Sequence, residues 1–505
     1  MKKTQKLLVN TIVLTAATFL MRTIEVSFNV YLTNKIGSAG IGLFQLVMTV
    51  YALSVTFASS GVRLASTRLT VDAVDVGKFR LKDIMNNCFG FALFMGITIS
   101  FLLFAFADII STKWLGDIMT ARPLKILAIA LPFIAVSSAL NGYYTASRKA
   151  SVFAVIQMAE QGVKIAIIVV LLKILLPKGV EYACISIVIG ITVSEVIAAL
   201  FSYTLYRMMR PSEKEKGKSE GIFRKMLRIA IPDSVGSSVR SILLTIEHIL
   251  IPIGFKKSGA SQTEALSIYG KVHGMVFPLL LYPSSVLGSL SGLLVPEIAE
   301  LDAKGLKRQI NSVIEICIKM TMIFSICTAG ILYIFASDFS QIIYKTKDCT
   351  MYIQILAPLI PVMYLDMMVD GMLKGLDQQL HSMRYNIFDS GICVVLVYFL
   401  IPRYSIKGYI AILFISEIIN FILSIRRLSK VANLKINLKN SIIKPIVAII
   451  IATLVQLCCG AHIREISKPL LFLKVLLTLS IYIFVLFLTK STDKKEIKRI
   501  KIFFR

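Results

Sequence analysis

Apolar segments long enough to cross a lipid bilayer recur along the whole chain. The hydrocarbon core of a bilayer is spanned by about 20 predominantly apolar residues wound as an α-helix. The repetition of such segments predicts an all-α polytopic membrane protein with about 14 transmembrane helices. Their approximate centres are Leu20, Val50, Ile97, Leu131, Ile165, Val188, Leu243, Tyr282, Ile323, Val362, Val395, Phe414, Ile449 and Leu477.

The first apolar segment carries a line of polar residues on one helical face. In a helix, residues three or four positions apart lie on the same side. An Arg and a Glu near the middle of a bilayer are costly unless they face water, protein or a polar substrate. The line therefore predicts a cavity wall, with a simple Arg22 to Glu25 ion pair inside a helix bundle as the alternative. Its members are Thr11, Thr15, Thr18, Arg22, Glu25, Asn29 and Thr33.

Composition and charge agree with a membrane protein. Hydrophobic residues make up 56% of the 505 positions, which excludes an ordinary soluble globular protein. The net charge of +27 would suit nucleic acid, but Lys and Arg gather in the short loops that we expect in the cytoplasm. We therefore assign the excess to topology and to contact with membrane lipid headgroups, with both termini cytoplasmic and no nucleic acid as partner. Examples are Arg207, Arg210, Lys214, Lys216, Lys218, Arg224, Arg426, Arg427, Lys430 and the tail after Lys490.

An internal repeat divides the chain into two halves. Leu131-Pro132 and Gly142 recur as Ile360-Pro361 and Gly371, displaced by 229 residues. Two halves of six spans each should be related by an axis along the membrane normal. We predict an N-lobe at 1–209, a cytoplasmic linker at 210–221 and a C-lobe at 222–430. Residues 431–505 hold two further helices and a basic cytoplasmic tail.

Charged residues in the first two spans of each half predict a cationic cavity. Arg63 ends the second span, Arg240 accompanies a polar line on the seventh, and Lys271 opens the eighth. A cationic cavity selects an anionic substrate, and Arg binds phosphate oxygens through two donors at once. The alternatives are that Arg63 reaches the interface and that Arg240 and Lys271 form internal ion pairs. The predicted cavity residues are Arg22, Glu25, Asn29, Arg63, Arg240, Ser241, Thr245, His248 and Lys271.

Catalytic motifs are missing from the sequence. It has no Walker A loop, no nucleophile elbow and no metal-binding His-Glu motif, so we expect neither an enzyme nor a cofactor or metal site. Asp366, Asp370 and Lys374 step by four along one span, which favours a structural role. His248 is interpreted as a hydrogen-bonded core residue.

Three long runs resemble a known family. GLFQLVMTVYALSVTFASSGVRLAS, SIYGKVHGMVFPLLLYPSSVLGSLSGLLVPEIAE and LAPLIPVMYLDMMVDGMLKGLDQQLHSMRYNIFDS resemble the stage V sporulation protein B family of polysaccharide-type lipid flippases, related to lipid II flippases. The resemblance covers nearly the whole chain. It implies a 14-helix fold and alternating-access transport of undecaprenyl-diphosphate-linked sugars across the bacterial plasma membrane. It also implies peptidoglycan synthesis for the spore cortex as the setting.

The resemblance also bears on the site. Cationic residues of the first, second and eighth helices line the cavity of lipid II flippases, and Arg22, Arg63 and Lys271 lie in the corresponding helices here. A Lys in the eighth helix lacks the two-donor grip of an Arg. Our leading hypothesis is a monomeric flippase for a polyprenyl-diphosphate-linked saccharide. The alternatives are a cation-coupled multidrug exporter of the same superfamily and a non-transporting scaffold that recruits cell-wall synthesis enzymes.

Overall fold

A computed structural model describes the backbone of residues 2–59, 61–74, 80–147, 149–209, 221–432, 434, 438–460 and 467–489. Helices dominate these residues, and no β-strand occurs among them, so the predicted all-α class is confirmed. Most of the predicted linker and the basic tail from Lys490 onward lie outside the described residues. The same holds for the side chains of Thr11, Thr15 and Thr18, although their backbone is helical.

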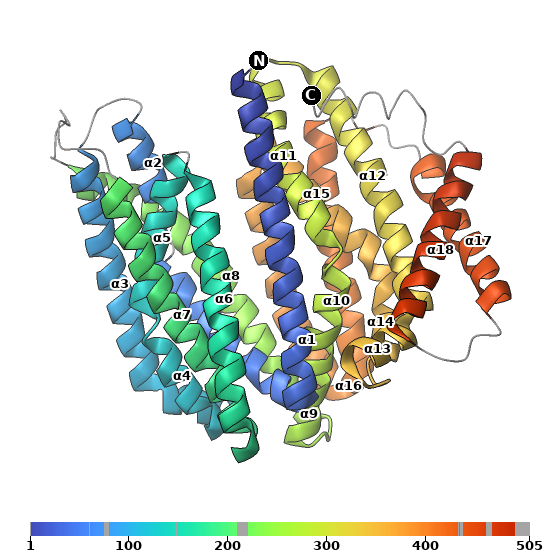
Figure 1. Ribbon diagram of the computed structural model, residues 1–505, viewed down its shortest axis with the longest axis horizontal. Helices are drawn as coiled ribbons and strands as arrows, with labels where there is room; N and C mark the ends of the chain where they lie inside the picture. The colour runs from blue at the N-terminus through green and yellow to red at the C-terminus, as the bar shows by residue number, and fades with distance from the viewer. Residues whose placement is uncertain are drawn as a thin grey trace. The chain divides into compact units, whose positions relative to one another are not determined.

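The first of two compact units contains residues up to Phe28 and from Lys35 to Gly270. Within it α6 packs on α7, and α5 packs on α2, α3 and α7 (Figure 1). Its elements are α1 (Lys2–Ser59) without residues 29–34, α2 (Val62–Val74), α3 (Leu81–Ile109), the π-helix η1 (Ile110–Leu115), η2 (Ile118–Thr120), α4 (Ala121–Ala128), α5 (Leu131–Ala146), α6 (Ala150–Leu175), η3 (Leu176–Lys178), α7 (Val180–Met209), α8 (Ile222–Lys257) and α9 (Gln262–Tyr269).

The second unit contains Asn29–Asn34 and the chain from Lys271 onward. Within it α15 packs on α11, α12 and α16, and α17 packs on α18, the red pair of Figure 1. Its elements are the π-helix η4 (Gly270–Val276), α10 (Phe277–Leu281), α11 (Ser284–Ala303), α12 (Lys307–Ile334), α13 (Ala336–Tyr344), α14 (Thr350–Leu356), η5 (Ala357–Leu359), α15 (Ile360–Gly375), α16 (Gln379–Val431), the π-helix η6 (Lys439–Ile443), α17 (Lys444–Gly460) and α18 (Lys468–Leu488).

Helix α8 belongs to the first unit by its contacts, because it packs against α2 and α3. The sequence repeat assigns the same span to the C-lobe. Packing contacts and the sequence repeat are different criteria for dividing the chain into parts. The lobe boundaries at 1–209 and 222–430 therefore stay a prediction about which segments the repeat relates. The physical reason for the close packing is Gly61, whose missing side chain leaves room for the Ala230 carbonyl oxygen.

Fewer helices meet the length and apolarity criteria for a membrane span than the sequence predicts. Nine helices among the described residues satisfy both criteria, or up to eleven if each of two bent pairs is one span. Two of the nine are broken by non-helical backbone, at Gly37 (φ 74°) in α1 and at Ser405 (φ 48°) in α16. The count of 14 remains a prediction.

Two helices at the predicted displacement have the same length. Helices α5 and α15 are each 16 residues long, and their ends lie 229 residues apart in the sequence. Their glycines make equivalent contacts: a Cβ at Gly142 would meet Ser66 of α2, and a Cβ at Gly371 would meet Ser291 of α11. The repeat therefore specifies the same helix pair in each unit.

Prolines mark two of the helix breaks. The chain bends by 47° just before α5, which has Pro132 in its first turn. It bends by 61° between α10 and α11, where Pro283 precedes the second helix. Proline cannot donate the helical hydrogen bond and clashes with the preceding turn, so both bends follow from its ring.

Two repeat-related segments of the first unit cross at van der Waals contact. A Cβ added at Gly42 would strike the Leu266 carbonyl oxygen, and one added at Gly270 would strike that of Ser38. The Ser38 and Ser267 hydroxyl groups are hydrogen-bonded across the same crossing at 2.7 Å. Only residues without a side chain allow two backbones to approach this closely.

We predict that Gly42→Ala destabilises the protein. Alanine in a helix interior is normally better than glycine by about 1 kcal/mol. Here the methyl group would meet a backbone carbonyl, and overpacking costs about 1–3 kcal/mol. Thermal unfolding in detergent should show a lower Tm.

The control is Gly90→Ala in α3, where no atom lies within 4 Å of the added Cβ. The Tm of this variant should be unchanged or higher. Equal Tm values for the two variants would contradict the crossing.

Candidate functional site

Arg22 and Glu25 form an ion pair on α1. The distance from the Arg22 guanidinium nitrogen to the Glu25 carboxylate oxygen is 2.8 Å, and the side chains are 37% and 59% exposed. The pair anticipated from the spacing of three residues therefore exists. It is accessible on the surface of the helix, so it does not neutralise a buried charge. The assignment of both residues to a cavity wall stays a prediction.

Asn29 connects α1 to η4 within the second unit. Its side-chain amide donates a 2.8 Å hydrogen bond to the Gly274 carbonyl oxygen, and Thr33 donates to the Asn29 carbonyl oxygen at 2.8 Å. In a π-helix each turn holds an extra residue, and such turns are frequent at functional sites. Asn29 thus fixes a short piece of α1 to the π-helix that contains the predicted site residue Lys271.

Lys271 is paired with a residue that the sequence did not single out. Its ammonium nitrogen lies 2.9 Å from a carboxylate oxygen of Asp348, and the side chains are 21% and 58% exposed. The hydrogen bond from Lys271, and then its charge, lower the pKa of Asp348 below the ordinary value. The anticipated alternative of an ion pair at Lys271 is therefore realised. The sequence holds no local signal for this partner, because the two residues meet only in the folded chain.

The loop that presents Asp348 is held on both sides. Tyr344, just before it, donates to the Met275 carbonyl oxygen of η4 at 2.6 Å. Ser340 of α13 donates to the Thr346 carbonyl oxygen of the loop at 2.5 Å, and the Asp348 amide donates to the Thr346 hydroxyl at 3.2 Å. Asp348 and Lys271 are thus positioned by hydrogen bonds that do not involve their own charges.

The polar line of α8 is used for contacts inside the first unit. The Ser241 hydroxyl donates to the Thr56 hydroxyl of α1 at 3.3 Å, and Thr245 is buried. His248 Nδ1 and the Tyr269 hydroxyl are hydrogen-bonded at 3.0 Å, which confirms the interpretation of His248 as a hydrogen-bonded residue. Arg240 is exposed on the same helix. The structure thus gives Ser241 and His248 packing roles, and their roles in binding stay predictions.

Arg63 lies exposed in the first turn of α2. The guanidinium group is accessible, as both a substrate contact and the alternative of an interfacial side chain require. Arg63 belongs with Arg22 and Arg240 to the first unit, whereas Lys271 belongs to the second. The convergence of these four cations on one cavity stays a prediction.

The acids of α15 hold helices together. Asp366 accepts a hydrogen bond from the Asn420 amide at 3.0 Å, and Asp370 pairs with Lys374 at 2.6 Å. Ser416 donates to Asp389 at 3.0 Å, which links the two halves of α16 across the break at Ser405. This confirms the structural role predicted for Asp370 and Lys374. No group of three or more His, Cys, Asp or Glu suited to a metal occurs among the residues that the structure describes.

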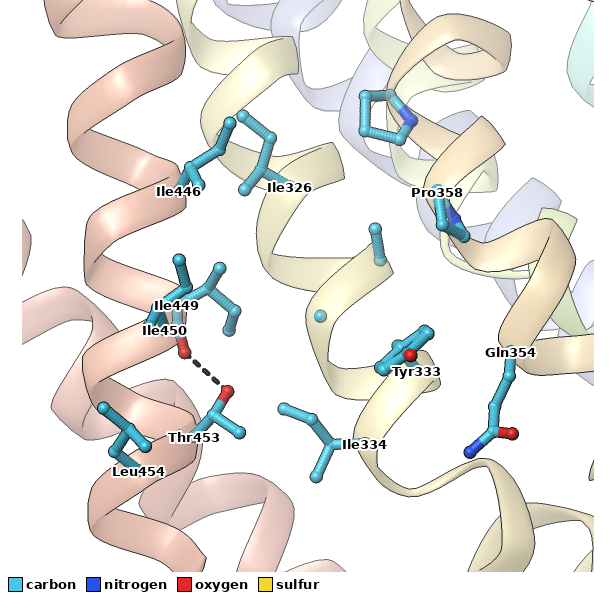
Figure 2. Close-up of a pocket in the computed structure, with 13 residues that line it drawn as sticks. Ile326, Tyr333, Ile334, Gln354, Pro358, Ile446, Ile449, Ile450, Thr453 and Leu454 are labelled. Carbon is cyan, nitrogen blue, oxygen red and sulfur yellow. Dashed lines mark hydrogen bonds between the residues drawn. The ribbon is translucent and has the colours of Figure 1, made fainter.

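An apolar pocket of about 670 Å³ lies between α12, the α14 to α15 segment and α17 in the second unit. Figure 2 shows isoleucines of α17 on one side and Pro358 and Gln354 on the other. Thr453 donates its hydroxyl to the Ile449 carbonyl oxygen at 2.6 Å, which satisfies that donor within α17. The lining is Ile326, Ala329, Gly330, Tyr333, Ile334, Gln354, Pro358, Pro361, Ile446, Ile449, Ile450, Thr453 and Leu454.

Comparison with known proteins identifies relatives over the full length. The family model described as polysaccharide biosynthesis protein matches residues 7–302. Stage V sporulation protein B of Bacillus subtilis (strain 168) is 23% identical, over 99% of this chain and 98% of the relative. The fold is similar to that of the lipid II flippase MurJ in an inward closed conformation, with a TM-score of 0.68, 14% identity, and 94% and 98% of the two chains covered.

A second structural relative is a multidrug resistance transporter of the MATE family and the MOP superfamily. It has a TM-score of 0.64 and 13% identity, with 83% of this chain and 98% of the transporter covered. Both comparisons show that the fold of this chain is similar to the folds of these two transport proteins. The match and the apolar helices together show a multi-pass membrane protein.

We predict that the Lys271 to Asp348 pair contributes a constant stability between pH 8 and pH 5. A carboxyl with a lowered pKa stabilises the folded state above its unfolded pKa, about 3.9, and loses this effect as the pH falls through the lower folded value. The Tm difference between the wild type and Asp348→Asn should therefore be the same at pH 8 and pH 5. A difference that shrinks within this range would show that the carboxyl titrates there.

Proposed function

We propose that this chain, which belongs to the family of polysaccharide biosynthesis proteins, is a flippase. Its proposed substrate class is a polyprenyl-diphosphate-linked saccharide. The observation that carries this proposal is the full-length similarity to stage V sporulation protein B. The proposed substrate is a lipid II-like peptidoglycan precursor for the spore cortex, moved by alternating access in the plasma membrane with both termini cytoplasmic.

The diphosphate is proposed to bind four cationic side chains. Arg22, Arg63 and Arg240 are at least partly exposed, so each guanidinium group is open to a ligand. Arg offers parallel donors to two phosphate oxygens, whereas Lys271 offers a point charge. Glu25, Asn29, Ser241, Thr245 and His248 are proposed for the sugar or peptide region.

The pocket beside α17 suits a hydrocarbon chain. Its lining is nearly all aliphatic or proline, and the Thr453 hydroxyl is already bonded within its own helix. Burial of each CH₂ group contributes about 0.8 kcal/mol relative to water, although a chain leaving lipid gains only from closer packing. We propose that this pocket holds part of the polyprenyl tail while the headgroup crosses.

Export of organic cations is the second candidate, because a multidrug transporter shares the fold. Cation recognition favours acidic and aromatic groups around the ligand. The predicted site has four basic residues, and its one acid, Glu25, is paired with Arg22. The charge balance therefore favours an anionic headgroup.

We predict that Arg22→Ala abolishes transport and leaves membrane insertion intact. The measurement is translocation of labelled lipid II in vesicles that contain the purified protein, with an organic cation added as competitor. The matched control is Arg122→Ala, which removes another exposed Arg that forms an ion pair, here with Glu181 at 3.5 Å. Undiminished translocation by Arg22→Ala would refute the role of Arg22. Transport of the organic cation by vesicles that do not translocate lipid II would favour the exporter.

We predict that Ala329→Phe weakens binding of the tail, because the ring would fill the apolar pocket. Binding of geranylgeraniol, an uncharged polyprenol, to the protein in detergent measures this effect without the headgroup. A severalfold higher Kd is expected. Leu473→Phe on α18, at a side chain that is 62% exposed, is the control. The same Kd in both variants would place the tail elsewhere.

A further inference from the structure

Lys271 differs from the proposed arginine ligands in the partner that it holds. Arg22 pairs with Glu25, its neighbour on one helix. Lys271 pairs with Asp348, which reaches it from a separate loop. The side chain of Lys271 is the more buried member, at 21% exposure against 58% for that of Asp348. Asp348 already occupies one donor of the Lys271 ammonium group, so an anion of higher charge that binds there competes with the carboxylate.

The geometry of the pair does not depend on the charges alone. Tyr344 fixes the start of the loop to the Met275 carbonyl oxygen, and Asn29 fixes η4 through the Gly274 carbonyl oxygen. Cys349, next to Asp348, is buried and lies 3.8 Å from the Met275 sulfur. The backbone at Asp348 is therefore held in place without help from Lys271, so the carboxylate stays within reach when an anion displaces it from the ammonium group.

Charge decides the outcome of this competition. A carboxylate carries one negative charge, whereas a diphosphate carries at least two and offers several acceptor oxygens. A diphosphate can therefore displace the carboxylate, but its binding is weakened by the free energy of the pair that it breaks. A lower affinity favours transport, because a site that binds its substrate too tightly cannot release it.

We propose that Asp348 is an internal counter-ion of Lys271, which the diphosphate of the substrate displaces on binding and which re-forms the ion pair on release. This inference rests on the proposed function. It makes Asp348 a positioning residue that tunes affinity without contacting the substrate. The charge of Lys271 is then compensated in both the loaded and the empty carrier.

The test is the affinity of the purified protein in detergent for geranylgeranyl diphosphate, with geranylgeraniol as the uncharged reference. Asp348→Asn and Asp348→Ser should each lower the Kd for the diphosphate by up to roughly fivefold, the range for loss of a partly exposed competing ion pair. Asp348→Glu should retain the wild-type value. Lys271→Gln should raise the Kd, and adding Asp348→Asn to it should change nothing further.

The matched control is Asp108→Asn, which breaks an ion pair of similar length and exposure, Lys125 to Asp108 at 2.8 Å, on α3 and α4. Its Kd should equal the wild-type value. A purely structural role for Asp348 would leave the Kd unchanged or raise it, and either result overturns the inference while diphosphate binding by the wild type keeps the proposed function. If the wild type binds the diphosphate no better than geranylgeraniol, the proposed function and the inference both fail.

Discussion

Hydrocarbon offers no partner for a hydrogen bond, and this constraint explains most of the structure. A polar backbone group left unpaired in lipid costs several kcal/mol, so a chain that crosses the bilayer many times must be helical there or satisfy its breaks internally. Serine and threonine side chains follow the same rule. Thr49, Ser54 and Thr453, for example, donate to the carbonyl oxygen four residues earlier in their own helices.

The same constraint accounts for how charged groups are arranged. Ionised side chains within apolar helices need a partner or water. Asp370 has Lys374 on the next turn, Asp366 has Asn420, and Asp389 has Ser416. The Asp366 bond joins α15 to α16, and the Asp389 bond joins the two halves of α16. Polar residues in these spans therefore fix the relative positions of helices as well as any ligand.

Sequence reasoning succeeded where the relevant information is local or periodic. The helical class follows from the length of the apolar segments, and the pairs Arg22 to Glu25 and Asp370 to Lys374 follow from helical spacing. The equal lengths of α5 and α15 follow from the repeat. Each of these features depends on residues a few positions apart, or on a comparison of the chain with itself.

Residue pairs that meet only in the tertiary structure could not be predicted from the sequence. Asp348 is one acid in a loop with basic neighbours, and nothing in its surroundings points to Lys271. The Gly274 carbonyl that binds Asn29 is a backbone group without any sequence signature. The pocket beside α17 is equally hidden, because residues that face a pocket and residues that face lipid are both apolar.

The glycine crossing in the first unit has a consequence for how substitutions act on it. Gly42 leaves room for the Leu266 carbonyl and Gly270 leaves room for the Ser38 carbonyl, so each segment offers the other the same surface at corresponding positions. Such reciprocity resembles an isologous interface between identical subunits, where one substitution changes both contacts at once. In this single chain the two glycines are separate positions, so the crossing persists only if both are kept.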